Sequence, residues 1–178
     1  MERRASRRIW IATCAACAAL GWACATPGTE GRLSDEERTR IEREVLARGD
    51  LLDRAYMEND LETYWSFYAD DLTQIWDTGY VSLEQYKQDW TALVAGGGGA
   101  VETRSQDMRI HVGPTGDTAV VTYLTVSRYR GTNGNETEGR FYETDVWFHR
   151  DGRWQIVHYH FSSAADAIAG APEEVGGE

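Results

Sequence analysis

The chain has 178 residues, of which 42% are hydrophobic, and a formal net charge of −11 at pH 7. Beyond the first ten positions its basic residues form no dense stripe, so this acidic chain is excluded as a partner for the phosphate backbone of nucleic acids. The roughly 130 residues from 34 to 163 have the size of one ordinary domain.

The first 25 residues differ in composition from the rest. Four arginines precede an apolar run at residues 9–22, and small residues follow at 23–25. This pattern predicts an export signal, because the run is shorter than the roughly 20 residues of a membrane-spanning helix. We therefore expect an exported protein, in the periplasm or elsewhere outside the cytoplasm. Residues 6–11 also resemble a twin-arginine signal, but an ordinary basic region explains them better.

Two forms of processing remain open for this leader. Residues 20–24 end in Cys24 and resemble a bacterial lipoprotein signal, in which a lipid on the cysteine anchors the chain to a membrane. Simple cleavage would instead release a soluble chain that starts with a linker at residues 26–33. All three cysteines lie in the leader, so the domain is expected to have no disulfide. Removing the leader's four arginines and one glutamate changes the net charge from −11 to −14.

Helix signals come first in the domain. Ser34 and Glu37 form a capping box, and apolar residues then recur at helical spacing (Ile41, Val45, Leu52, Tyr56). Asp60 is expected to cap a second helix that runs past Tyr68 and ends at residues 70–71. Ser82 is expected to cap a third helix, which the glycines at 96–99 end.

Strand signals follow the helices. A short strand is expected at 72–76, and four long strands at about 101–112, 118–130, 136–150 and 153–163, with turns at 113–116, 133–134 and 151–152. Helices followed by an antiparallel sheet indicate an α+β fold in which the helices cover one face. Residues 164–178 are rich in Ala, Gly and Glu, and we expect a flexible acidic tail there.

The last two strands predict a candidate site. Asp151-Gly152 is typical of a two-residue hairpin turn, which fixes the register by counting. Asp145 then faces His158, Glu143 faces His160, and both pairs lie on the same face as Trp147. The opposite face would be apolar (Tyr142, Val146, Phe148, Val157, Tyr159, Phe161). A patch of this size predicts a homo-oligomer, a dimer in the simplest case, formed through the outer face of the sheet.

The order of elements, with a bend at residues 59–64 and the ending Asp-Gly-Arg-Trp-Gln-Ile-Val-His-Tyr-His-Phe-Ser, resembles the nuclear transport factor 2-like (NTF2-like) superfamily. The similarity covers about residues 38–163. It is strongest to the SnoaL-like and DUF4440 groups and to the association domain of calcium/calmodulin-dependent protein kinase type II. The resemblance implies a cone-shaped fold in which a curved antiparallel sheet wraps the N-terminal helices around a pocket, with oligomers formed through the sheet. The kinase association domain has pocket arginines where this chain has Thr125 and Asp145, so a neutral or cationic guest fits better than an anion.

Three functions remain open, since proteins of this fold differ in activity. The first is binding of a small hydrophobic molecule in the pocket. The second is acid–base catalysis without a cofactor, such as isomerisation, dehydration or cyclisation, with His158 as base, Asp145 as its orienting partner and Tyr123 as hydrogen-bond donor. The third is a non-catalytic assembly module. Polar groups on an inner sheet face also satisfy one another in many folds without a functional role.

The remaining candidate residues are expected to contact the ligand. They combine polar groups with aromatic side chains, as small-molecule pockets do (Glu143, His160, Trp147, Thr125, Tyr64, Trp76, Trp90). The pattern His-x-His with a facing carboxylate suits zinc or iron, but no further ligand pattern supports it. We expect no metal and no cofactor.

Overall fold

The computed structural model describes residues 33–164. Within this range the elements are α1 (Asp35–Glu58), α2 (Leu61–Trp65), β1 (Tyr68–Trp76), β2 (Gly79–Tyr80), α3 (Leu83–Ala95), β3 (Gly99–Val112), β4 (Thr118–Arg130), β5 (Glu136–Arg150) and β6 (Arg153–Ser163). The expected export signal with Cys24, nearly all of the linker and the tail beyond Ala164 lie outside the described residues. Ala164 itself is buried, and its N–H donates to the carbonyl of Arg140.

The helices begin where the capping residues predict. The Ser34 hydroxyl accepts a hydrogen bond from the backbone N–H of Glu37, and the Glu37 carboxylate accepts one from the N–H of Ser34, which satisfies two otherwise unpaired donors. The side chains of Asp60 and Ser82 cap α2 and α3, each accepting one hydrogen bond, from the backbone N–H of Thr63 and of Gln85. The prediction that the second helix extends past Tyr68 is wrong. α2 ends at Trp65 because the sheet captures the chain there: the N–H of Ile156 donates to the carbonyl of Phe67.

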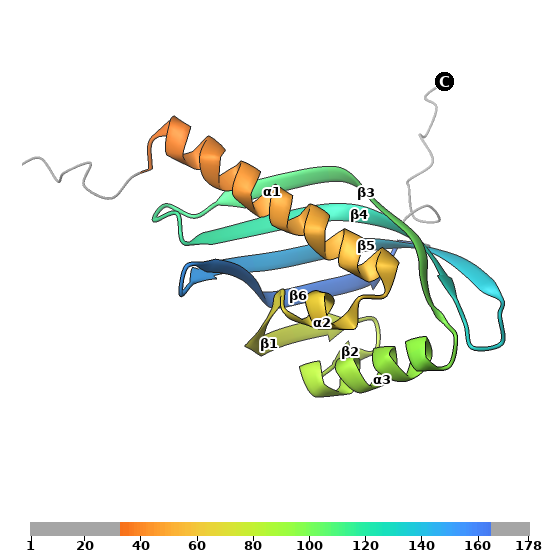
Figure 1. Cartoon of the computed structure of the whole chain (residues 1–178). Helices are drawn as coiled ribbons and strands as arrows, with labels where there is room; N and C mark the ends of the chain where they lie inside the picture. Colours follow the sequence, from red (N-terminus) through yellow and green to blue (C-terminus); the bar gives the residue numbers. More distant parts are fainter. Residues whose placement is uncertain (1–32, 165–178) are drawn as a thin grey trace, which may run out of the picture. The chain divides into compact units, whose positions relative to one another are not determined.

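Six strands form one curved sheet in the order β2-β1-β6-β5-β4-β3. The pairing is antiparallel except between β1 and β6, which run parallel, so the expected purely antiparallel sheet is mixed at one edge. The two-residue strand β2 was not predicted from the sequence. The helix α1 lies across the concave side of the sheet, and α2 and α3 lie near the β1 edge (Figure 1). This arrangement is the predicted α+β fold with helices inside a curved sheet.

The hairpin of β5 and β6 contains one extra residue. Asp151 and Gly152 have positive φ angles of 51° and 76°, as the expected turn requires, and Trp147 pairs with Ile156 as predicted. Beyond that pair the register shifts at a β-bulge around Val157, so that Val146 pairs with His158. A one-residue shift exchanges the two faces of a strand.

The predicted pairs beyond the bulge are therefore wrong. Asp145 pairs with Tyr159 rather than with His158, and Glu143 pairs with Phe161 rather than with His160. Tyr159 and the phenyl ring of Phe161 turn to the concave side of the sheet, and both histidines turn to the convex side.

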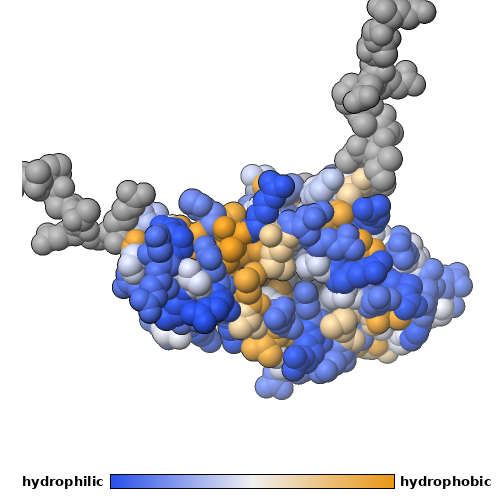
Figure 2. All heavy atoms as spheres, turned by 90° about the horizontal axis from the view of Figure 1, so that it is seen from above, coloured by the Kyte–Doolittle hydropathy of each residue, from blue (hydrophilic) through white to orange (hydrophobic). Residues whose placement is uncertain are grey.

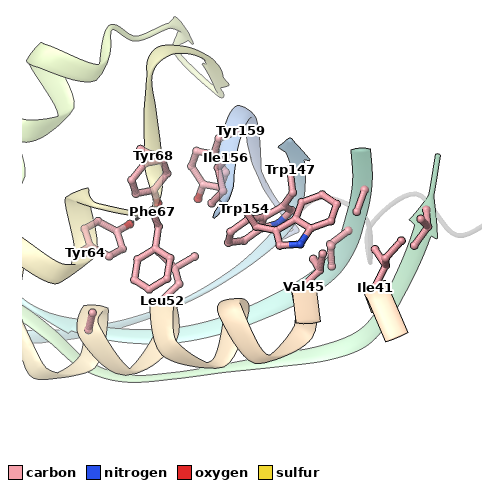
Figure 3. Close-up of a cluster of buried hydrophobic side chains, with 14 of the residues drawn as sticks. Ile41, Val45, Leu52, Tyr64, Phe67, Tyr68, Trp147, Trp154, Ile156 and Tyr159 are labelled. Carbon is pink, nitrogen blue, oxygen red and sulfur yellow. Dashed lines mark hydrogen bonds between the residues drawn. The ribbon is translucent and has the colours of Figure 1, made fainter. Parts of the chain in front are cut away.

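The hydrophobic core fills the space between α1 and the sheet. Trp147 and Trp154 lie side by side near Val45 and Ile41 of α1, while Leu52 lies toward Phe67 (Figure 3). Only 1% of Trp147 is exposed, and loss of a buried tryptophan typically costs about 3 to 5 kcal/mol. Trp147 thus belongs to the core.

The convex face exposes less apolar surface than the sequence suggested. Tyr142 is half exposed and Val146 and Phe148 are partly exposed, but Tyr159 and Phe161 are on the other side. On the side seen from above, hydrophilic residues cover most of the visible surface and a hydrophobic band crosses its middle (Figure 2). No helix in residues 33–164 has the length and apolar character needed to cross a membrane.

Candidate functional site

A cavity of about 430 Å³ lies between the three helices and the concave face of the sheet. Its lining includes seven of the ten residues predicted to form the site: Tyr64, Trp76, Trp90, Tyr123, Thr125, Glu143 and Asp145. Each comes from a strand position that faces inward or from a helix face turned to the sheet. The exposed Asp89 and the half-buried Trp90 line it from α3.

Two carboxyl groups and two phenols meet at the inner surface of β4, β5 and β6. The Tyr123 hydroxyl lies 2.8 Å from Asp145 Oδ2 and 3.1 Å from Glu143 Oε2, and the Tyr159 hydroxyl lies 3.1 Å from the same Glu143 oxygen. Tyr123 has one proton, so it donates to one carboxylate at a time. We call these four residues the acid–phenol cluster.

Burial shifts the acid–base properties of this cluster. It raises the pKa of Glu143 to about 7, although the neighbouring hydroxyls of Thr125, Tyr159 and Tyr123 oppose the rise by stabilising the anion. Burial and then the negative charge of Glu143 raise the pKa of Asp145 well above its ordinary value. The pair therefore holds protons at pH values where exposed carboxyl groups have lost them.

A third carboxyl group approaches from α1. Burial raises the pKa of Asp53 to about 6, and a hydrogen bond from Ser105 partly offsets the rise. Asp53 also raises the pKa of Glu143 and of Asp145 through its charge. The cavity thus gathers acidic groups from two separate elements.

The phenols of Tyr64, Tyr68 and Tyr86 form a second polar group beside the cluster. The hydroxyl of Tyr68 donates to that of Tyr64 at 2.8 Å, and the Tyr64 and Tyr86 hydroxyls are 2.6 Å apart. Burial raises the pKa of all three well above the ordinary value. They remain neutral hydrogen-bonding groups at any physiological pH.

Aromatic rings form much of the remaining wall. Tyr56 stacks on Trp90 with ring centroids 5.1 Å apart, and Phe141 stacks on Phe161 at 4.3 Å. Trp76 meets Tyr86 edge to face at 5.1 Å. Such walls bind flat apolar molecules, because large rigid rings offer much contact area at little entropic cost.

Three predicted site residues do not reach the cavity. His158 lies on the convex face, where its Nδ1 is 2.8 Å from the Thr73 hydroxyl, and His160 lies on the same face near Asp77. The predicted register placed both histidines inside because it did not include the bulge at Val157. Trp147 faces inward but lies in the core beneath α1. The predicted base His158 and its partner Asp145 are thus on opposite faces of the sheet.

The most important residue that sequence reasoning missed is Tyr159, which contacts the acid pair in place of the histidine. No local signal marks the bulge that brings it inside. The sequence does contain a signal for Asp53. It is an acidic residue within the apolar stripe of α1, one position after the buried Leu52 and three before Tyr56. The polar role of Tyr86 was not predicted from the sequence either.

The described residues provide no metal site: no group of three or more His, Cys, Asp or Glu side chains in residues 33–164 could hold a metal ion. The His-x-His pattern, considered above as a metal-binding alternative, points away from the carboxylates of Glu143 and Asp145. The ionisable side chains that line the cavity are carboxyl and phenol groups.

The comparison with known families agrees with this architecture. The model of the SnoaL-like domain family matches residues 45–166, which is more than half of the chain. The chain belongs to the SnoaL-like domain family. The match includes every residue of the acid–phenol cluster.

Solved structures show the same fold as this SnoaL-like domain. One is described as a putative calcium/calmodulin-dependent protein kinase II association domain from Xanthomonas campestris, with 20% identity, a TM-score of 0.59, and 70% of this chain and 88% of that chain covered. An NTF2-like protein of unknown function in nutrient uptake from Rhodospirillum rubrum has 20% identity and a TM-score of 0.59, covering 67% and 97%. The association domain of C. elegans CaMKII has 21% identity and a TM-score of 0.53, covering 73% and 100%. At these identities the likeness establishes the NTF2-like fold alone.

The raised pKa of Glu143 predicts a pH dependence of stability. The unfolded chain ionises Glu143 near 4.5 and the folded chain near 7, so between these values the folded state binds more protons and the free energy of unfolding falls as pH rises. The substitution Glu143→Gln removes the titrating group and with it this decrease in the free energy of unfolding. From pH 5 to pH 8, urea unfolding should show a decrease for the wild type that exceeds that of the variant by about 2 kcal/mol.

The groups facing Glu143 are Asp53, Asp145, Thr125, Tyr123 and Tyr159, so the measured change includes the release of Asp145 from its neighbour's charge. Glu138→Gln, at an exposed position of the same strand, is the control and should keep the wild-type pH dependence. Equal pH dependence in all three proteins would contradict a buried, proton-retaining Glu143.

Proposed function

We propose that the SnoaL-like domain binds a small, mainly apolar molecule in its cavity, with the acid–phenol cluster fixing the orientation of the guest. The observation that carries the proposal is the combination of a roughly 430 Å³ cavity with stacked aromatic walls and one polar end. Cavities of this size that place a few convergent polar groups in an aromatic lining are typical of ligand sites. An assembly module needs no such interior.

Filling the cavity should abolish binding. N-phenyl-1-naphthylamine, a neutral probe whose fluorescence rises in apolar sites, should bind the wild type saturably with one site per chain. Thr125→Trp places a large ring in the cavity and should weaken binding by at least about tenfold, since it removes the contact area. Thr122→Trp, on the convex face of the same strand, is the matched control and should bind as the wild type does.

Binding that both tryptophan variants retain, or that both lose, would contradict a role for the cavity. Circular dichroism of both variants verifies that the fold is intact. If N-phenyl-1-naphthylamine shows no saturable binding to the wild type, the proposal is also contradicted.

A second candidate function is acid–base catalysis without a cofactor, with Glu143 as the base in place of the predicted His158. The observation in its favour is the pKa of about 7, since a base is most effective when its pKa lies near the working pH. Tyr123 and Tyr159, both within 3.1 Å of Glu143, are placed to donate to an oxyanion that forms as the substrate loses a proton. Isomerisation, dehydration and ring closure all begin with such a step.

Proton exchange tests this candidate without knowledge of the natural substrate. The acidic C–H groups of 2-tetralone exchange with D2O, and NMR should show a faster exchange in the presence of the wild type. Glu143→Gln should reduce the enzyme-dependent rate by about a hundredfold or more, and His158→Gln should leave it unchanged. No acceleration over buffer, or a loss in His158→Gln alone, would remove Glu143 as a catalytic base.

We also propose export by the leader and self-association through the convex face. Support for the latter comes from the partly exposed strip of Tyr142, Val146 and Phe148 and from solved relatives described as association domains. Light scattering on the chain from residue 26 should give twice the monomer mass, and Tyr142→Lys should lower it. A strictly monomeric wild type would contradict self-association.

A further inference from the structure

The charged groups of the cavity are all acidic. Its lining within the described residues includes four carboxylic side chains, from α1, α3 and β5, and no Lys, Arg or His (Asp53, Asp89, Glu143, Asp145). The ion pairs found in residues 33–164 use other carboxylates, on the outer surface. The fold therefore gives these four carboxyl groups no cationic partner.

When Glu143 and Asp145 are both ionised, their hydrogen-bond acceptors exceed the donors around them. Tyr123 and Tyr159 supply two phenol protons to the four carboxylate oxygens, and the Thr125 hydroxyl is the further donor beside Glu143. Asp145 Oδ1 is buried and has no hydrogen-bond partner among the described residues. A buried acceptor without a hydrogen-bond donor lowers the stability of the fold. A guest with two or three N–H donors would supply the missing hydrogen bond.

Aromatic side chains form much of the lining that surrounds these carboxyl groups. The ring of Tyr56 stacks on that of Trp90, and Trp76 meets Tyr86 edge to face. Asp89, which is exposed, lines the same cavity. Rings of Trp and Tyr attract cations through their electron-rich faces. A lining of carboxyl groups and aromatic faces therefore favours a positively charged guest.

We infer that the ligand of this cavity is an organic cation, an apolar and preferably aromatic body that carries one protonated amine. The inference rests on the proposed binding function and names the chemical class of its ligand. The amine donates to Glu143 and Asp145, and the apolar body lies between the rings. A carboxylate guest is disfavoured by like charge. A neutral guest of the same shape brings fewer donors to Asp145 than an ammonium group and no compensating charge.

Three probes that share an indole ring test the charge preference directly. Tryptamine is a cation, tryptophol is neutral and indole-3-acetate is an anion at pH 7.5. Calorimetric titration of the wild type should show tryptamine binding about tenfold or more tighter than tryptophol, and no measurable binding of indole-3-acetate. Glu143→Gln should reduce the preference for tryptamine over tryptophol, and Glu138→Gln should keep it.

The outcomes separate this inference from the function on which it rests. If N-phenyl-1-naphthylamine binds but tryptamine shows no advantage over tryptophol, the cavity binds ligands and the assignment of a cation is wrong. Equal preference in the wild type and in Glu143→Gln would likewise overturn it. If neither the naphthyl probe nor any of the three indoles binds, both the inference and the proposed binding function are wrong.

Discussion

The site depends on one extra residue in the last hairpin. Because the β-bulge at Val157 shifts the register of β6 against β5, every side chain of β6 beyond it changes face. Tyr159 enters the cavity and the two histidines leave it. The acid pair Glu143 and Asp145 thereby gains a phenol as a neighbour instead of an imidazole, and a buried acidic site lined by no histidine of the described residues results.

This exchange determines what the cavity is suited to do. A histidine opposite Asp145 would have neutralised it and formed a conventional base. Two phenols instead stabilise carboxylates only in part, so burial dominates and Glu143 reaches a pKa of about 7. Keeping two carboxyl groups in an aromatic interior lowers the stability of the fold. Groups with such shifted pKa values are common at functional sites. A guest that brings positive charge or a labile proton would interact with the carboxyl groups of Glu143 and Asp145, which have no cationic partner among the described residues.

Much of the architecture could be predicted from the sequence. Ser34, Asp60 and Ser82 mark the helix starts because capping is a local interaction, and the Asp151-Gly152 turn is equally local. The inward direction of Tyr123, Thr125, Glu143 and Asp145 followed from the alternation of strands. The bulge did not follow, because it reflects how β6 is held between β5 and β1, where Val157 accepts a hydrogen bond from Thr73 of a distant strand. The parallel pairing of β1 with β6 and the approach of Asp53 from α1 are likewise long-range features.

The register of β5 and β6 is the central claim, and NMR tests it most directly. Nuclear Overhauser contacts between backbone protons identify which residues of two antiparallel strands lie opposite each other. The structure predicts cross-strand contacts that pair Asp145 with Tyr159 and Glu143 with Phe161. Contacts that pair Asp145 with His158 and Glu143 with His160 would contradict the bulge, return the histidines to the cavity and remove the basis for an acidic site without histidine.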